Sequence, residues 1–278
     1  MSGRLVVCPT PIGNMEDITL RVLAALREAD VIAAEDTRHT RALLDRYGVS
    51  APLVSYHEHN EDRRAAELVS RMQAGEVVAL VSDAGMPLVS DPGYVLVRAC
   101  VAAGLAVEVL PGPSAALTAL VASGLPSDSW RFVGFLPRKK GELRRVFADS
   151  AAGGGTLVAF ESPRRVPASL EVLASVDPDR QVAVARELTK LHEEVVRGTA
   201  AELAARYADD PPRGEVVLVV APPAVVAEPL SDEAVVAVRR LVEAGAKPRA
   251  AAGVVAELTG ASANALYAAV SEKRASSS

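Results

Sequence analysis

The densest run of polar side chains in this chain, EDTRHTR at residues 35–41, directly follows a short apolar segment. Arg38 and Arg41 suit a phosphodiester ligand, because a guanidinium donates paired hydrogen bonds to phosphate oxygens. An alternative is the start of a solvent-exposed helix, with Asp36 or Thr37 as the capping residue. Capping explains the aspartate but not the cationic side chains beside it. The residue pattern leaves both interpretations open.

A second pair of cations, Arg164 and Arg165, opens a predicted helix after an apolar strand. Positive charge at a helix N-terminus opposes the helix dipole by several tenths of a kcal/mol, and a ligand phosphate would offset that effect. These two arginines are therefore candidate phosphate ligands. The basic residues 138–140, with Arg144 and Arg145, are more simply an exposed linker surface.

Three turns rich in glycine and proline indicate where a ligand would bind. Each follows a short apolar strand and precedes a helix-like segment, and they span residues 9–14, 82–93 and 111–116. In a parallel sheet the turns that follow strands share the carboxyl edge, where open α/β folds bind their ligands. Glycine lets the backbone approach a ligand closely, and proline stiffens the turn. The pattern predicts a small-molecule site, and the run at 35–41 starts from the same edge.

The alternation of strands and helices predicts a parallel α/β sheet for the first part of the chain. The expected strands are 5–8, 31–34, 53–55, 77–81 and 107–110, and the expected helices are 19–28, 40–47, 63–74, 94–103 and 114–122. Asp91 and Pro92 are expected to start the fourth helix, as cap and first-turn residue. A loop-like stretch at 126–131 suggests a first domain over residues 1–125.

A second group of strands predicts a second α/β domain over residues 126–224. The expected strands are 132–136, 156–161, 181–187 and 215–221, with a short strand or turn at 195–198 and helices near 166–173 and 199–207. Residues 221–229 are interpreted as a linker. Three short helices separated by glycine follow, at 231–244, 248–259 and 262–270. Residues 225–278 are therefore expected to form a linker and a helix-turn-helix-like module, with a disordered end at 276–278.

The composition excludes several classes of protein. No apolar stretch approaches the roughly 20 residues of a membrane span, and the N-terminus leaves no room for a signal peptide. Cys8 and Cys100 lie in apolar segments and are interpreted as buried, reduced thiols. These features predict a cytoplasmic protein without membrane contact. The net charge of −5 argues against a general nucleic-acid coat but permits a local basic patch.

Several common binding motifs are absent from the sequence. It holds neither the GxGxxG and GxxxxGK[ST] phosphate-binding patterns nor the GxSxG nucleophile turn. His57 and His59 have no third ligand nearby, so no metal site is expected. The chemistry should therefore be one that needs little protein machinery.

The chain also carries seven short motifs, which span most of its length. They are TPIGN (10–14), AEDTRHT (34–40), SDAGMPLVSDPG (82–93), PGPSA (111–115), FVGFLP (132–137), FESPRR (160–165) and RELTK (186–190). In this order and spacing they closely resemble the bacterial small-subunit ribosomal RNA methyltransferase I family of the tetrapyrrole-methylase superfamily. The resemblance covers residues 4–221, and the helical tail is similar to the family's C-terminal module. Met86 is a departure, because threonine is common at that position.

The resemblance implies S-adenosylmethionine as methyl donor and a cytidine 2′-hydroxyl in the decoding region of 16S rRNA as acceptor. It implies two α/β domains with the donor in the cleft between them, a small helical module and a homodimer. The implied partner is 16S rRNA within the small ribosomal subunit. By the superfamily pattern the donor-binding positions are Pro11, Asp83, Ala84, Gly85, Pro87, Ser114, Ala115, Phe160, Leu188 and Gly214.

Methyl transfer from a sulfonium needs alignment of the reacting atoms more than dedicated catalytic groups. A ribose hydroxyl is a poor nucleophile, however, so a base or a nearby cation should assist. The candidates are Asp36, His39, Glu161 and Lys190, of which Lys190 could act as a base only if its pKa is depressed. The candidates for contact with RNA phosphates are Arg38, Arg41, Arg164 and Arg165.

Two other functions stay open at this point. A tetrapyrrole C-methyltransferase would share the donor site and bind a polycarboxylate macrocycle, although the helical module and the AEDTRHT motif argue against it. A donor-binding ribosome-assembly factor without turnover would keep the same turns, but an intact set of donor turns makes it the weaker idea. Labelled methyl transfer to ribosomal particles distinguishes the three.

Overall fold

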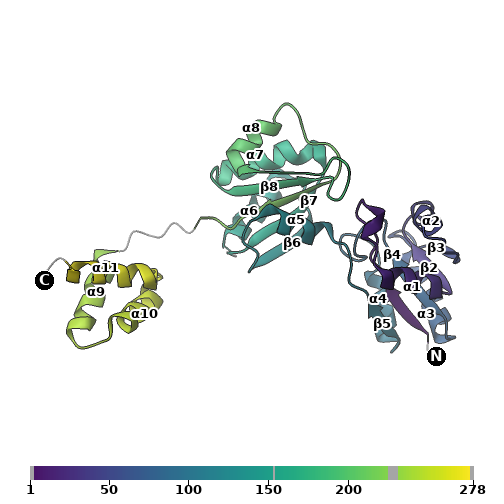
Figure 1. Cartoon of the computed structure of the whole chain (residues 1–278), viewed down its shortest axis with the longest axis horizontal. Coiled ribbons are helices and arrows are strands. Elements are labelled where there is room, and N and C mark those ends of the chain that lie inside the picture. Colours follow the sequence, from purple (N-terminus) through teal and green to yellow (C-terminus); the bar gives the residue numbers. More distant parts are fainter. Residues whose placement is uncertain (1–2, 153, 225–230, 276–278) are drawn as a thin grey trace. The chain divides into compact units, whose positions relative to one another are not determined.

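The computed structural model describes residues 3–152, 154–224 and 231–275. The chain divides into two compact units, residues 1–223 and residues 224–278 (Figure 1). The larger unit contains two five-stranded sheets with their helices, and the smaller unit is helical. The expected fold class, α/β with a C-terminal helical module, is confirmed.

The first sheet is fully parallel, with strand order β3-β2-β4-β1-β5. Its strands are β1 (Arg4–Val7), β2 (Val31–Ala34), β3 (Leu53–Ser55), β4 (Val77–Val81) and β5 (Ala106–Val109). Along the central strands, alternate side chains enter two separate apolar cores: Val6 packs in one, and Leu5 and Val7 in the other. A strand buried on both faces must be apolar at every position, which explains the uninterrupted apolar runs in the sequence.

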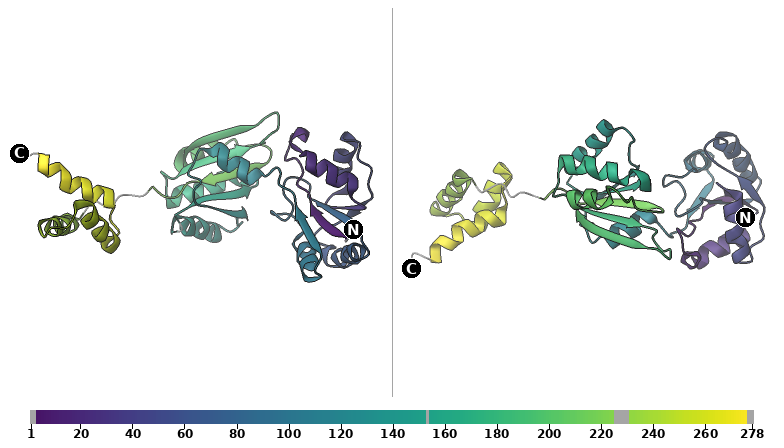
Figure 2. Two further views of the ribbon diagram at one scale, coloured as in Figure 1. Left: turned by 60° about the horizontal axis from the view of Figure 1, so that its bottom comes forward. Right: turned by 90° about the horizontal axis from the view of Figure 1, so that it is seen from above.

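Helices cover both faces of this sheet (Figure 2). They are α1 (Leu20–Glu28), α2 (Thr37–Arg46), α3 (Glu61–Gln73) and α4 (Tyr94–Ala102), with a 3-10 turn η1 (Met15–Asp17) before α1. Thr19 caps α1 by accepting a hydrogen bond from the backbone N–H of Val22. Each helix amino end lies at the carboxyl edge of the sheet, because a right-handed crossover returns the chain antiparallel to its strands.

The expected start of α4 at Asp91 and Pro92 is wrong. The helix begins at Tyr94, after Gly93 with φ +142°. Leu88 and Ser90 both have positive φ, so the preceding segment is a compact turn. A Cβ on Gly93 would lie 2.6 Å from Leu88 Cδ1, so this turn packs closely against the start of the helix.

The second sheet is mixed, with strand order β6-β7-β10-β8-β9. Its strands are β6 (Trp130–Phe135), β7 (Thr156–Glu161), β8 (Gln181–Arg186), β9 (Glu194–Thr199) and β10 (Val216–Val220). β6 and β7 pair in parallel, and all other pairs are antiparallel. The segment at 195–198, for which strand and turn were both open, lies inside β9.

Helices pack on both faces of the second sheet. α6 (Lys140–Ala152), α7 (Val166–Val176) and α8 (Ala200–Tyr207) share one apolar core with it, and α5 (Ala115–Ser123) packs on the other face. The segment expected to be a basic linker is therefore helix α6, anchored by buried Leu143 and Phe147 one turn apart. Because α5 contacts β7, β8 and β10 but precedes residue 125, the domain boundary stays a prediction.

The smaller unit contains α9 (Asp232–Glu243), α10 (Pro248–Thr259) and α11 (Ala263–Ala275) around a small apolar core. Gly245 and Gly260 have positive φ where α9 and α10 end, as the glycine spacing suggests. Part of the expected linker, 225–230, and the expected disordered end, 276–278, lie outside the described residues. In the part of the chain that the structure describes, no helix is both long and apolar enough to cross a membrane.

Candidate functional site

The turns after β1 and β4 are joined directly at the carboxyl edge of the first sheet. The backbones of Thr10 and Gly85 exchange two hydrogen bonds of 2.9 and 3.0 Å. The Thr10 hydroxyl also donates to the carbonyl of Ser82, at 3.1 Å. The third turn closes on the first, because a Cβ on Gly112 would lie 2.8 Å from the ring of Pro9. The expected meeting of the three turns at one edge is confirmed.

The polar run after β2 joins the same edge. The backbone N–H of Asp36 donates to Asp83 Oδ1 at 3.0 Å. The Asp36 carboxylate caps α2 by accepting from the Arg38 N–H, and it also pairs with the Arg38 guanidinium at 2.8 Å. These hydrogen bonds lower the pKa of Asp36. The helix-start interpretation therefore accounts for Asp36. The same carboxylate also holds the Arg38 guanidinium.

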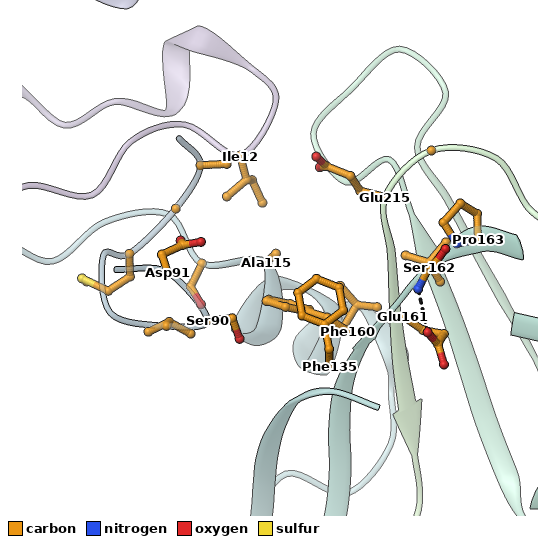
Figure 3. A pocket seen from close by; sticks show the side chains of 18 residues that line it. Ile12, Ser90, Asp91, Ala115, Phe135, Phe160, Glu161, Ser162, Pro163 and Glu215 are labelled. Atoms are coloured by element: carbon orange, nitrogen blue, oxygen red, sulfur yellow. Dashed lines mark hydrogen bonds between the residues drawn. The ribbon is translucent and has the colours of Figure 1, made fainter. Parts of the chain in front are cut away.

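A cavity of about 330 Å³ lies between these turns and the second sheet; we call it the donor cavity (Figure 3). Phe160 of β7 forms one wall and packs edge-to-face on Phe135, with ring centroids 5.6 Å apart. The opposite wall is built of small side chains and exposed backbone, with Ala84 and Ala115 among its members. The predicted donor positions that line it are Ala84, Gly85, Ser114, Ala115, Phe160 and Gly214. Phe135, Asp91 and Glu215 also line it and were not expected from the sequence.

A tight loop of the second sheet holds Gly214 in place. Gly214 has φ +84°, and Glu187, directly after β8, also has positive φ. The Glu187 carboxylate accepts from the backbone N–H of Glu215 and from the Lys190 ammonium, both at 3.0 Å. Lys190 donates in addition to Glu215 Oε2, at 3.0 Å. The ammonium therefore ties together two loops of the second sheet that line the site.

The two α/β parts of the larger unit touch at this loop. The backbone N–H of Asn14, in the first turn, donates to Thr189 Oγ1 at 2.9 Å. A Cβ on Gly13 would lie 2.5 Å from Lys190 Cγ, so only glycine permits this approach. The loop that carries Lys190 thus sits against the first Gly/Pro turn.

A neighbouring cavity of about 390 Å³ shares Ile12, Ala84 and Glu215 with the donor cavity. The predicted site residues that line it are Pro11, His39, Asp83 and Lys190. Burial lowers the pKa of Lys190, but its hydrogen bonds to Glu215 and Glu187 outweigh that effect and raise the pKa overall. The condition under which Lys190 could act as a base, a depressed pKa, is therefore not met.

Three carboxyl groups, those of Asp83, Glu35 and Asp91, gather at this edge, and only Asp83 was predicted from the sequence to be part of the site. Burial, followed by the charges of Glu35 and Asp83, raises the pKa of Asp91 to about 7. Burial and the charge of Asp83 also raise the pKa of Glu35. The Glu35 Oε2 atom is buried and has no hydrogen-bond partner among the described residues. Asp91 was interpreted as a helix cap and was therefore not predicted as part of the site. Only the folded turn brings it to the wall of the donor cavity.

This pKa shift makes a prediction about stability. Below about pH 3 the carboxyl of Asp91 is mostly protonated in both the folded and the unfolded chain. As the pH rises from its ordinary pKa of 3.8 towards 7, only the unfolded chain ionises, so the native state loses stability. Asp91→Asn should therefore raise the free energy of unfolding by about 1 kcal/mol at pH 8, after discounting for the partial exposure of the group.

Urea unfolding followed by circular dichroism at pH 8 and pH 5 measures this difference for Asp91→Asn and the unmodified chain. The gain should shrink as the pH falls. A gain that is equal at both pH values, or larger at pH 5, would contradict the assignment. Asp128→Asn serves as the matched control, since Asp128 is exposed in a loop and should show no pH-dependent gain.

Glu161 lines the donor cavity, and its carboxylate is bonded to neighbouring groups of the protein. Its carboxylate accepts from the backbone N–H of Ser162 at 2.7 Å and from the Ser169 hydroxyl at 2.6 Å, and it lies 3.3 Å from Arg165 Nη2. Arg165 also donates to the carbonyls of Leu136 and Pro137. This geometry favours a positioning role for Glu161 and Arg165 at the 3-10 turn η2 (Pro163–Arg165) that precedes α7.

The remaining predicted residues lie outside the two cavities. Leu188 is buried in the core beneath α5, and Pro87 lines neither cavity. Arg38, Arg41 and Arg164 are exposed. No three His, Cys, Asp or Glu side chains of the described residues gather as a metal site would require.

Comparison with known proteins identifies the family. The sequence matches the Tetrapyrrole (Corrin/Porphyrin) Methylases family over residues 4–204. Ribosomal RNA small subunit methyltransferase I of Mesorhizobium japonicum is 47% identical over 267 residues, which cover 95% of this chain and 90% of that protein. This chain belongs to the ribosomal RNA small subunit methyltransferase I family. The family member of Escherichia coli O157:H7 is 45% identical over 268 residues, covering 95% of this chain and 93% of that protein.

Solved structures of other methyltransferases share the fold of this methyltransferase I family member. The methyltransferase CobJ has a TM-score of 0.59 at 24% identity and covers 80% of this chain and 95% of its own. Uroporphyrin-III C-methyl transferase from Thermus thermophilus, complexed with S-adenyl homocysteine, has a TM-score of 0.54 at 22% identity and covers 79% of this chain and 97% of its own. The tetrapyrrole-methylase fold is thereby confirmed.

Proposed function

We propose that this chain methylates the 2′-hydroxyl of a cytidine ribose in the decoding region of 16S rRNA, with S-adenosylmethionine as methyl donor. The observation that carries this function is the 47% identity to ribosomal RNA small subunit methyltransferase I over 95% of the chain. The choice of a cytidine 2′-hydroxyl rests on the family resemblance of the seven motifs. An rRNA substrate also implies action in the bacterial cytoplasm.

The residues of the donor cavity fit such a donor. Its apolar wall of Phe135 and Phe160 suits an adenine ring, which stacks on aromatic side chains. The small residues Ala84 and Ala115 leave backbone groups accessible for polar contacts. Asp83, in the neighbouring cavity, keeps one carboxylate oxygen beyond the one that accepts from Asp36, and this oxygen suits an ammonium group or a ribose hydroxyl. The structural neighbour from T. thermophilus, a uroporphyrin-III C-methyl transferase, was solved in complex with S-adenyl homocysteine.

When bound, S-adenosylmethionine supplies an electrophilic methyl group that already carries the activating positive charge. The protein then has to hold the acceptor oxygen in line with the methyl group, which is catalysis by orientation. The tied loops at Gly214 and Lys190 and the joined turns at Thr10 and Gly85 supply rigid walls for that purpose.

Four residues were predicted to assist loss of the hydroxyl proton, as a base or as a cation, and three of them are held by hydrogen bonds within the protein. Asp36 caps α2, Glu161 accepts from neighbouring donors, and Lys190 is held protonated by two carboxylates. The His39 side chain is exposed, lines the neighbouring cavity, and makes no hydrogen bond to the described residues. We therefore assign proton removal to the His39 imidazole.

His39→Ala is expected to lower kcat for methyl transfer by roughly 10²- to 10⁴-fold, the usual contribution of a general base. Donor affinity by calorimetry and the thermal midpoint should stay unchanged, because the side chain is exposed. Asp45→Ala, on the exposed face of the same helix, is the matched control. Full activity of His39→Ala would transfer the role to another group at this edge.

We propose further that the chain acts as a homodimer on an assembled small subunit. Exposed apolar side chains support the dimer: Val121 of α5 is 79% exposed, and Leu117 on the same helix is also exposed. Arg41 and Arg164 are available for RNA phosphates, whereas Arg38 is paired with Asp36 and Arg165 with Glu161. Analytical ultracentrifugation distinguishes the dimer from a monomer.

Tritiated S-adenosylmethionine and small-subunit particles from cells that lack this protein test the function. After nuclease digestion, label in 2′-O-methylcytidine is the expected result. Intact donor binding without label would overturn the rRNA assignment and lead to tetrapyrrole substrates. Label in another nucleoside would retain the enzyme class and change the acceptor.

A further inference from the structure

A cavity of about 590 Å³, distinct from the donor and neighbouring cavities, lies beside the second sheet. Its walls come from the end of β8, the segment 192–194, the last turn of α8 and the loop 210–213. The lining residues are Arg186, His192, Glu194, Arg206, Tyr207, Asp210, Pro211, Pro212 and Arg213. We call it the basic cavity. None of its residues lines either of the other two cavities.

Cations outnumber anions in the basic cavity, although the whole chain has a net charge of −5. Glu194 accepts from Arg186 Nε at 2.7 Å and lies 3.6 Å from Arg206 Nη2, so one carboxylate orients two guanidinium groups. Arg213 and His192 are exposed and form no ion pair or side-chain hydrogen bond with the residues that the structure describes. Their donors are therefore available to an anionic ligand.

A buried hydroxyl in the same cavity also lacks a partner. Tyr207 is 6% exposed, and its hydroxyl oxygen is buried without a hydrogen-bond partner among the described residues. Burial raises the pKa of Tyr207, so the group stays a neutral donor at physiological pH. Arg206 is close enough to lower that pKa in part, yet it does not meet hydrogen-bond geometry with the hydroxyl. A buried donor without a partner is destabilising unless a ligand satisfies it.

The basic cavity and the two cavities of the proposed methyl-transfer site are lined by residues that follow one another in the chain. Arg213 directly precedes Gly214 and Glu215, which line the donor cavity. Arg186 directly precedes Glu187, the partner of Lys190. The loop that carries Arg213, Gly214 and Glu215 therefore contributes to the basic cavity and to the donor cavity.

We propose that the basic cavity binds a backbone phosphate of the substrate RNA, next to the nucleotide that is methylated. This inference rests on the proposed function. Arg213 and His192 would contact the phosphate oxygens, and Arg206 and Tyr207 would complete the donor set. Arginine matches a phosphate because its planar group donates two parallel hydrogen bonds. Pro211 and Pro212 restrict the backbone beside Arg213, which lowers the entropy lost when the ligand binds.

Binding of fluorescein-labelled protein to small-subunit particles from cells that lack this protein, measured by anisotropy over a range of KCl concentrations, tests the proposal. Arg213→Ala and Arg206→Ala should each weaken binding about 5- to 10-fold, and each should reduce the slope of log Kd against log salt by about 1. Arg46→Ala, an exposed arginine at the carboxyl end of α2, is the matched control and should bind as the unmodified chain does. Calorimetry with S-adenosylmethionine should give the same donor Kd for all four proteins.

The outcomes separate this inference from the proposed function. If the unmodified chain methylates particles while both cavity variants keep its Kd and salt slope, the basic cavity is not an RNA site and the function stands. If the variants lose RNA affinity but the unmodified chain transfers no label, the phosphate site stands and the proposed reaction fails. Failure of the unmodified chain to bind the particles would overturn the inference. Weakened donor binding by Arg213→Ala, without a change in salt slope, would also overturn it.

Discussion

Gly214→Ala is expected to lower the affinity for S-adenosylmethionine by about 10- to 100-fold. Gly214 has φ +84°, a conformation that a side chain occupies only with strain. The added Cβ would also lie 2.5 Å from Glu187 Cγ and overlap the Glu187 carboxyl group. That carboxylate cannot move without giving up its hydrogen bonds to the Glu215 N–H and the Lys190 ammonium. The wall of the donor cavity should therefore shift.

Calorimetric titration with S-adenosylmethionine measures this effect. Gly104→Ala is the matched control: Gly104 has φ +68°, but an added Cβ there meets no atom within 4 Å. The control carries the same backbone strain without the collision, so it should lose some stability and keep the donor Kd. Equal donor affinity for the two variants would show that the Gly214 loop does not form the donor site.

Glu161→Ala should lower the free energy of unfolding by about 3–5 kcal/mol, the effect expected when one partner of a buried charge pair is removed. The Glu161 side chain is 0% exposed, and its loss leaves the Ser162 N–H and the Ser169 hydroxyl without their acceptor and Arg165 without its carboxylate partner. The thermal midpoint should fall by roughly 10 °C in a unit of this size. Glu161→Gln keeps one acceptor oxygen and should fall in between.

Urea and thermal unfolding followed by circular dichroism measure these changes. The control is Glu171→Ala on the exposed surface of α7, whose ion pair with Lys140 spans 3.7 Å and contributes little. Methyl-transfer assays on Glu161→Gln separate positioning from catalysis. Normal stability with complete loss of activity would restore Glu161 as a catalytic residue and refute the positioning role.

Local patterns in the sequence determined much of the first sheet and its ligand edge. Apolar runs followed by Gly/Pro turns specify parallel strands and the turns after them, because both depend on neighbours in the chain. The cap at Asp36 and the glycine requirement at Gly85 are local in the same way. The helix at 140–152 was not predicted, because the segment is rich in charged residues. The signal for it was the spacing of Leu143 and Phe147, which are buried one turn apart.

The chemical state of the site was decided by tertiary structure. Lys190 stays protonated because Glu215, distant in sequence, joins Glu187 at its ammonium. Asp91 gains its raised pKa only where the folded turn buries it beside Glu35 and Asp83. The basic cavity likewise needs the end of β8, the last turn of α8 and Arg213 in one place. Burial and charge depend on which groups meet in space, whereas turns and periodic apolar faces depend on neighbours along the chain. Local sequence therefore specifies the framework of the site, and tertiary contacts set its electrostatics.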